Sequence, residues 1–208
     1  ANSVTDYMGV NNGTVQGDAL QTESGKFGRG FEFDGVGDYV EVGDDASLNI
    51  TGNLTISAWI YSEDYQQKYG YVVAKNNVYN LRTGTTGTGI IEFYVVIDTA
   101  AYVAESSALT DSQWYHLVGT YNGSNVKLFI DGIEVDSTPA TESIDTTLNT
   151  VRLGTRSGNY FFNGTLDEVM IFNRSLGANE IQALYNATLL EHTETGLADG
   201  SHTFKAYT

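Results

Sequence analysis

The chain has 208 residues, a net charge of −16 and no cysteine, and 41% of its residues are hydrophobic while only 17% are charged. This composition excludes a disordered chain, which would combine high charge with few aromatic residues, and it excludes disulfides and thiolate chemistry. The negative field repels nucleic acid and anionic lipid, and no apolar run is long enough for membrane insertion, so neither partner is expected.

Stretches of alternating apolar and polar residues recur along the chain and predict β-strands. The first two, 31–33 and 39–42, flank a Gly- and Asp-containing turn and are expected to form a hairpin. In the next stretch, 54–61, the alternation places one set of apolar side chains on a common face. Further strands are predicted at 71–74, 78–81, 90–97, 151–153 and 165–172.

The strongest local pattern lies between residues 114 and 135. Two dipeptides, Asn122-Gly123 and Asp131-Gly132, separate three alternating runs, and such dipeptides are strong signals for tight hairpin turns. The pattern therefore predicts a three-stranded meander.

A helical period occurs only near the C-terminal end, where a short amphipathic helix is predicted to begin near Gly177 and to cover an edge or end of the strands. About a dozen short strands with turn signals, together with this helix, predict an all-β fold. We expect a two-sheet antiparallel β-sandwich, or jelly roll, with one short C-terminal helix.

The residues from 188 to 208 differ from the rest in character. A polar stretch is followed by the alternating run HTFKAY at 202–207. One interpretation is a last strand of the sandwich. The other divides the chain into a sandwich at 1–187 and, at 188–208, a linker with the possible first strand of a following Ig-like module.

Five segments carry a family resemblance: GRGFEFDGVGDYVEV (28–42), LTISAWI (54–60), WYHLVGTYNG (114–123), VKLFIDG (126–132) and FFNGTLDEVMIFNRSL (161–176). In this order they resemble the laminin-G-like jelly-roll domains of bacterial and archaeal surface proteins, within the concanavalin-A-like lectin and glucanase superfamily. The resemblance implies two curved sheets with a concave face, in a larger multidomain secreted or surface protein. It also implies binding of a glycan or a cell-surface protein, often with calcium.

The superfamily includes glycoside hydrolases, whose catalysis depends on a pair of carboxylates. The glucanase relatives carry a Glu-x-Asp-x-x-Glu run, and retaining glycosidases need two carboxylates about 5–5.5 Å apart. No such run occurs, and the nearest acidic pairs, Glu142/Asp145 and Asp167/Glu168, have the wrong spacing. His116 lies within a predicted strand, where a hydrogen-bonded, half-buried histidine is expected rather than a catalytic base. The chain is therefore expected not to be an enzyme.

A calcium site is the most concrete chemistry that the sequence suggests. In a regular strand, the side chain of Asp167 points to the same face as those of Val169 and Ile171. Its carboxylate is therefore expected on an apolar face, where a charged group requires an ionic or hydrogen-bonding partner. In the glucanase relatives a structural calcium takes an aspartate from the equivalent strand and ligands from an N-terminal turn, which the resemblance matches to Asp34 and Asp38. The hypothesis is a structural calcium at Asp34, Asp38 and Asp167. The alternative is that Asp34 and Asp38 are ordinary turn residues and that Asp167 accepts backbone hydrogen bonds.

The resemblance also places a ligand site, because pentraxin-like relatives bind at one end of the concave face. The corresponding loops hold Asn76, Asn77, Arg156, Asn159 and Tyr160, whose amides, guanidinium and ring suit sugar hydroxyls and stacking. Four more tyrosines are candidates for the same face, and each has the alternative of packing with its hydroxyl at the rim: Tyr69, Tyr71, Tyr79 and Tyr94.

Seven Asn-x-Ser/Thr triplets occur, at Asn12, Asn49, Asn53, Asn122, Asn163, Asn173 and Asn186. Chance predicts roughly three, so the count favours an extracellular glycoprotein, although turns rich in Asn, Gly, Ser and Thr produce such triplets as a side effect. The expected function is a non-catalytic extracellular adhesion module that recognises carbohydrate. The alternative is protein–protein adhesion or a structural spacer.

Overall fold

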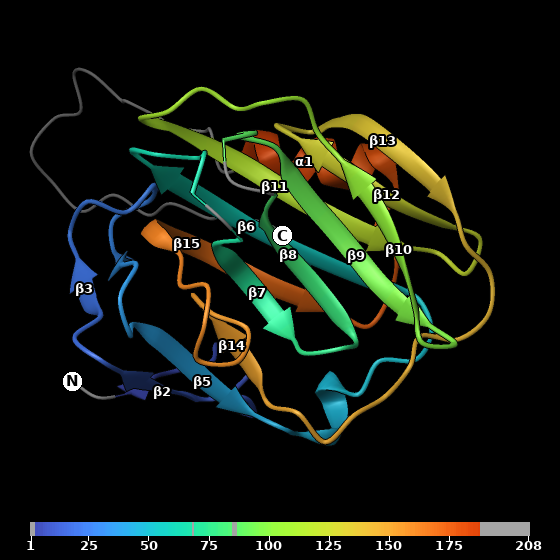
Figure 1. Ribbon diagram of the computed structural model, residues 1–208, viewed down its shortest axis with the longest axis horizontal. Coiled ribbons are helices and arrows are strands. Elements are labelled where there is room, and N and C mark those ends of the chain that lie inside the picture. The colour runs from blue at the N-terminus through green and yellow to red at the C-terminus, as the bar shows by residue number, and fades with distance from the viewer. Residues whose placement is uncertain (1–2, 68, 85–86, 188–208) are drawn as a thin grey trace, which may run out of the picture.

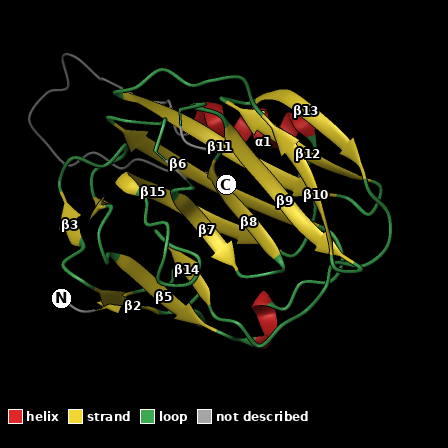
Figure 2. Ribbon diagram, in the orientation of Figure 1, coloured by secondary structure: helices red, strands yellow, loops and turns green. Residues whose placement is uncertain are grey.

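The computed structural model describes residues 3–67, 69–84 and 87–187, which form two antiparallel β-sheets packed face to face (Figure 1, Figure 2). The eight-stranded sheet contains, in spatial order, β1 (Ser3–Val4), β2 (Gly13–Gln16), β5 (Tyr39–Gly43), β14 (Val151–Leu153), β7 (Tyr71–Lys75), β8 (Tyr79–Thr83), β9 (Ile91–Ile97) and β10 (Ala100–Glu105). The seven-stranded sheet contains β13 (Ile133–Pro139), β12 (Asn125–Ile130), β11 (Gln113–Tyr121), β6 (Leu54–Ser62), β15 (Asn163–Phe172), β4 (Gly30–Asp34) and β3 (Leu20–Thr22). A 3₁₀ turn (Ala46–Leu48) and one helix, α1 (Ala178–Ala187), complete the described part. The predicted β-sandwich is confirmed.

The core lies between the two sheets and is built by the predicted alternation. In β6 the side chains of Leu54, Ile56 and Ile60 are fully buried in the main hydrophobic cluster. In β11 the inward position opposite Ile56 is Gly119, and a Cβ there would lie 2.2 Å from the ring of Phe93 on β9. Glycine is therefore required at this position so that a large aromatic ring can cross the interior between the sheets.

The meander is confirmed, because β11, β12 and β13 pair antiparallel in sequence order. The expected hairpin at residues 31–42 is wrong. β4 pairs with β3 and β15 in the seven-stranded sheet, whereas β5 pairs with β2 and β14 in the eight-stranded sheet. The turn between them, with Gly35 and Gly37 at positive φ, crosses from one sheet to the other, which alternation within each strand does not reveal.

The helix α1 begins where the sequence predicts it. The Glu180 carboxylate accepts a hydrogen bond from the Gly177 backbone N–H at 2.9 Å, in the manner of a capping box. Instead of covering an edge or end, the helix packs on the outer face of the seven-stranded sheet, where Ile181 joins Val118 and Phe129 (Figure 1). The helix therefore buries the apolar side chains that this face of the sheet would otherwise expose to solvent.

In the described residues no helix is both long and apolar enough to span a lipid bilayer. Residues 188–208 lie outside the described part, so the two interpretations of that segment both stay predictions.

Candidate functional site

The outer face of the eight-stranded sheet, turned away from the other sheet, carries polar and aromatic side chains in place of apolar ones. Tyr79 and Leu81 of β8 point into the core. The intervening residues Asn80 and Arg82 therefore point outward, and the register pairs them with Tyr94 and Glu92 of β9.

Arg82 organises this face. Its Nε donates to the Glu92 carboxylate at 2.7 Å, and its Nη1 donates to the Tyr71 hydroxyl at 2.6 Å. Its guanidinium carbon lies 4.4 Å from the centre of the Tyr69 ring and 5.1 Å from that of Tyr94, within cation–π range. Burial raises the pKa of the Tyr71 hydroxyl, so Tyr71 remains a neutral phenol beside the ion pair.

Two residues of the 155–160 loop join this arrangement. The Tyr160 ring lies edge-on to Tyr69, with ring centres 5.4 Å apart, and 40% of Tyr160 is exposed. The Arg156 guanidinium lies 5.2 Å from the centre of the Tyr71 ring. We call the set Tyr69, Tyr71, Arg82, Tyr94, Arg156 and Tyr160 the tyrosine–arginine cluster.

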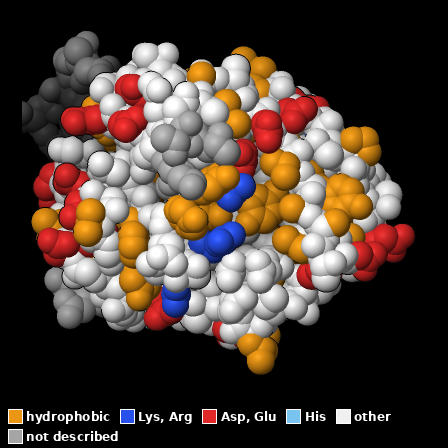
Figure 3. All heavy atoms as spheres, viewed as in Figure 1, with side chains coloured by type: hydrophobic (Ala, Val, Ile, Leu, Met, Phe, Trp, Pro, Cys, Tyr) orange, Lys and Arg blue, Asp and Glu red, His pale blue; other side chains and the backbone are white. Residues whose placement is uncertain are grey.

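An open groove of about 1220 Å³ runs over this face. At one end it is lined by Arg82, Arg156 and Tyr94, and towards the β9–β10 turn it is lined by Asp98, Glu142 and Asp145. Figure 3 shows Lys and Arg side chains surrounded by hydrophobic ones near the middle of this face, on a surface that otherwise carries scattered acidic groups. The groove is thus a mostly polar concavity with one aromatic side chain, Tyr94, in its lining.

Two polar groups on this face lack partners among the described residues. Both ends of the Asn80 side-chain amide are buried and make no hydrogen bond, and Asn80 is fully buried. The Nε of Arg156 is likewise buried without an acceptor. Leaving a buried donor or acceptor unpaired costs about 1–3 kcal/mol, so these groups lower the stability of the sheet at this face.

The structure brings together part of the predicted ligand set. Asn77 and Arg156 both line the groove, and Tyr160 belongs to the tyrosine–arginine cluster. Asn159 is exposed on the same loop, and its carbonyl accepts a hydrogen bond from the Thr155 hydroxyl at 2.9 Å. The carbonyl of Asn76 accepts from the Asn149 amide at 2.9 Å, which ties the β7–β8 turn to the 147–149 segment.

Tyr79, a candidate for the same face, points the other way. It is fully buried in the core, and its hydroxyl donates to the Leu48 carbonyl at 3.0 Å. Sequence reasoning also missed Arg82 and Asn80. The alternation in Tyr-Asn-Leu-Arg-Thr at 79–83 contains the necessary signal, because it puts Asn80 and Arg82 opposite the apolar Leu81.

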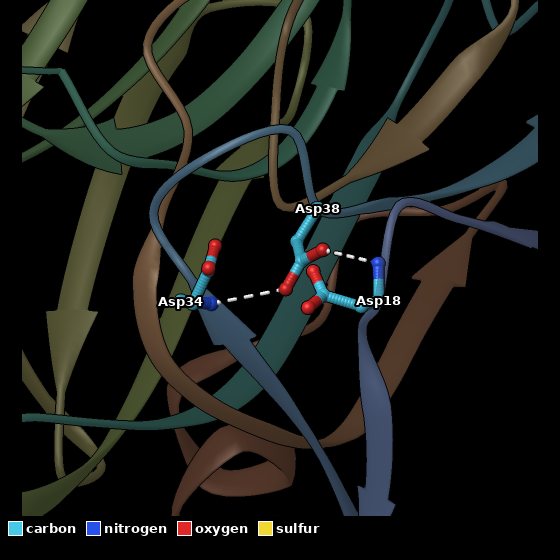
Figure 4. A group of neighbouring side chains, drawn as sticks. All are labelled: Asp18, Asp34 and Asp38. Carbon is cyan, nitrogen blue, oxygen red and sulfur yellow. Dashed lines mark hydrogen bonds between the residues drawn. The ribbon is translucent and has the colours of Figure 1, made fainter.

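A second group of interest is an acidic cluster made of Asp18, Asp34 and Asp38, from which one oxygen per carboxylate lies within 4.8 Å of the others. Asp38 is 2% exposed and accepts hydrogen bonds from the backbone N–H groups of Asp18 at 2.8 Å and Asp34 at 3.1 Å (Figure 4). The Asp34 carboxylate accepts from the Val36 N–H within its own turn. Asp18, which precedes β3, was not predicted.

Asp167 lies apart from this cluster. A register shift between Asp167 and Met170, with Glu168 at φ 48°, inserts a β-bulge into β15. Asp167 is consequently paired with Trp59 and faces outward, whereas Ile171 is paired with Ile56 and faces the core. The expectation that the two side chains lie on the same face of the strand is wrong. The Asp167 carboxylate accepts backbone hydrogen bonds from Phe27 at 2.9 Å and Glu168 at 2.8 Å.

The acidic cluster fits a hard cation by its donor set. Calcium prefers carboxylate and carbonyl oxygens, and none of the ion pairs in the described residues involves the three aspartates. By this chemistry, the carboxylates of Asp18, Asp34 and Asp38 suit a calcium ion. Asp167 is not part of this cluster.

His116 and Ser57 form a hydroxyl–imidazole pair, with Oγ and Nε2 2.8 Å apart. Both residues are fully buried, beneath Tyr185 of α1, whose ring stacks near the His116 ring. Burial lowers the pKa of His116 to about 4. A substrate has no access to this pair, which is a structural contact in the packing between α1 and the sheet.

Comparison with known proteins agrees with the fold. The sequence profile of the concanavalin A-like lectin/glucanases superfamily matches residues 34–182, and the chain belongs to this family. No curated protein matches the chain.

Solved structures with the same fold include two kinds of binding domain. Domain 4 of AbnA, a GH43 extracellular arabinanase from Geobacillus stearothermophilus, in complex with arabinotriose, superposes with a TM-score of 0.69 at 19% identity, over 85% of this chain and 92% of that one. The receptor binding domain of botulinum neurotoxin C/D mosaic serotype gives 0.70 at 18% identity, over 86% of this chain and 48% of the toxin domain. The binding domain of botulinum neurotoxin DC in complex with rat synaptotagmin II gives 0.70 at 16% identity, over 89% and 51%. This chain thus spans about half the length of the toxin domains, and the likeness shows the fold.

Proposed function

We propose that this protein is a non-catalytic glycan-binding module whose ligand occupies the groove on the outer face of the eight-stranded sheet. The observation that carries the proposal is the groove itself, which is lined by Tyr94, Arg82 and Arg156 and adjoins the other rings of the tyrosine–arginine cluster. Sugar rings offer hydroxyls for polar side chains and flat apolar faces for tyrosine rings. The arabinotriose complex of the arabinanase domain supports the proposal by analogy.

The setting of the module is part of the same proposal. We place it outside the cell, as one domain of a larger surface protein, because of the seven glycosylation triplets and because the arabinanase relative is described as extracellular. A non-catalytic role follows from the missing Glu-x-Asp-x-x-Glu run and from the Asp145 carboxylate, which is occupied by the backbone N–H groups of Asp98 and Thr99, both at 2.9 Å.

Protein–protein adhesion is the second candidate, and the edge strand β13 favours it. Ile133 and Val135 on this strand are 65% and 43% exposed, which leaves apolar side chains on an open sheet edge. The synaptotagmin complex of the toxin domain offers an analogy for a protein partner.

A glycan array probed with the purified chain separates these candidates. We expect binding to one glycan class, and Tyr160→Ala is expected to weaken it about tenfold or more, the loss typical of a contact worth ~1.4 kcal/mol. Tyr7→Ala is the matched control, because Tyr7 is 99% exposed and lies outside the groove, and it should bind as the parent does. Absence of binding to every glycan on the array would contradict the glycan-binding function and favour protein–protein adhesion.

We further propose that the acidic cluster holds a structural calcium ion that stabilises the turn between β4 and β5. Excess calcium is expected to raise the melting temperature relative to EDTA, because a ligand at 100 times its dissociation constant adds about 2.7 kcal/mol to the free energy of unfolding. Asp34→Asn, which keeps an acceptor for the Val36 N–H, should abolish the shift. Glu63→Gln removes one exposed charge elsewhere and should retain it. Equal melting curves in calcium and EDTA for the parent chain would refute the site.

A further inference from the structure

Basic side chains are scarce in this chain, and most of those described are neutralised. Six form ion pairs with a carboxylate: Arg29, Lys75, Arg82, Lys127, Arg152 and Arg174. Arg156 forms no such pair with any described residue, although the sequence has 26 acidic residues. A guanidinium is charged at every physiological pH, so Arg156 carries a positive charge that the described part of the protein leaves uncompensated.

The position of this charge is specific. Arg156 lines the groove and lies over the face of the Tyr71 ring, while its Nε is buried without an acceptor. The neighbouring Arg82 presents a contrast, because its Nε and Nη2 are both taken by Glu92 and its Nη1 by Tyr71. Of the two arginines in the groove, Arg156 is therefore the one with donors free for a ligand.

The two ends of the groove differ in charge. Arg82 faces Glu92 near the start of β9, whereas Asp98 follows the end of β9. Asp98 lies six positions after Glu92 along the strand, which corresponds to about 20 Å. The acidic end also contains Glu142 and Asp145. The carboxylates of Asp98 and Glu142 accept hydrogen bonds from sugar hydroxyls, and all three carboxylates repel anionic groups.

Building on the glycan-binding function proposed above, we propose that the groove recognises an oligosaccharide with a single anionic group at one end, held by Arg156, and a neutral, hydroxyl-rich remainder that runs toward the acidic end. The anionic group is a carboxylate or a sulfate ester, since both match the donors of a guanidinium. A glycan charged along its whole length is disfavoured by the carboxylates at the far end and by the net charge of the chain.

The test uses four trisaccharides measured by calorimetry against the intact chain. One ends in glucuronic acid at its non-reducing end, the second is its carboxyl-reduced neutral counterpart, the third carries a 6-sulfate in place of the carboxylate, and the fourth is triglucuronate. We expect the singly charged sugar, in its carboxylate or its sulfate form, to bind at least tenfold more tightly than the neutral one. Whichever of the two binds more tightly identifies the anionic group. Triglucuronate should bind more weakly than either.

Arg156→Gln is expected to remove the preference for the charged sugar, so that the charged and the neutral sugars bind the variant with equal affinity. Arg156→Lys should retain part of the preference, and Arg174→Gln, which removes an exposed arginine outside the groove, should retain all of it. Melting curves of each variant check folding. Equal binding of charged and neutral sugars by the parent chain would overturn this inference and leave the glycan-binding function standing. Failure of all four sugars, together with an empty glycan array, would overturn both.

Discussion

At the scale of single residues, His116 shows how burial governs the pH response. It is fully buried between β6, β11 and α1, and its pKa is lowered to about 4 by desolvation. The unfolded chain binds a proton near pH 6.5, and the folded chain does so only near pH 4. The free energy of unfolding contributed by neutral His116 is therefore fully present above pH 6.5 and is lost as the pH falls toward 4.

From the size of this shift, the loss is expected to be about 3 kcal/mol between pH 6.5 and 4. His116→Gln removes the titrating group. The free energy of unfolding of this variant should therefore depend less steeply on pH in this window than that of the parent protein, even where the variant is less stable overall. Urea unfolding at half-unit pH intervals measures both slopes. Asp131, whose carboxylate accepts a hydrogen bond from the backbone N–H of residue 116, is present in both proteins and cancels in the difference. Parallel slopes would contradict the account of His116.

Single residues also show which side-chain directions the sequence predicts and which it does not. The alternation in β6 correctly predicts which side chains enter the core, because a strand of uniform register has a period of two. In β15 the period of two is interrupted after Asp167, because Glu168 occupies a bulge that reverses which side chains face the core. Nothing in the local sequence specifies the bulge, which depends on pairing with β6 more than a hundred positions earlier. Asp18 was missed for a related reason, since only the fold brings it to Asp38.

At the scale of elements, the close approach of β9 and β11 depends on Gly119. Gly119→Ala places a Cβ 2.2 Å from the Phe93 ring, which is fully buried and cannot move without cost. The substitution is expected to lower the free energy of unfolding by about 1–3 kcal/mol, the range of an overpacked core. Chemical denaturation measures the change.

Two further variants give this prediction its controls. Gly52→Ala adds a methyl group in open space and should change stability by less than about 0.5 kcal/mol. Combining Gly119→Ala with Phe93→Leu should cost less than the sum of the two single changes, because the smaller side chain relieves the contact. Strict additivity would show that the ring is not the obstacle.

The meander of β11–β13 was predictable because its turns are tight and local. The assignment of β4 and β5 to different sheets was not, because strand alternation is the same in either sheet. The placement of α1 over β11 and β12 follows from the apolar residues on their outer face, which sequence alone could have assigned to either sheet.

At the scale of the whole molecule, the two faces of the sandwich have different roles. The outer face of the seven-stranded sheet is covered by α1 and contributes to stability. Over the groove, no described residue covers the outer face of the eight-stranded sheet, which contains the tyrosine–arginine cluster. The predicted ligand loops lie beside this groove, but its floor is formed by strands, and Arg82, whose side chain organises this face, comes from β8.

The most direct test of the central claim locates the ligand. The tightest-binding glycan from the array is titrated into isotopically labelled protein, and backbone amide shifts are followed by NMR. The account predicts that the perturbed amides cluster in β8, in β9 and in the 155–160 loop, with little change at α1 and at the acidic cluster. Perturbations confined to α1, to the β13 edge or to the turn between β4 and β5 would contradict it.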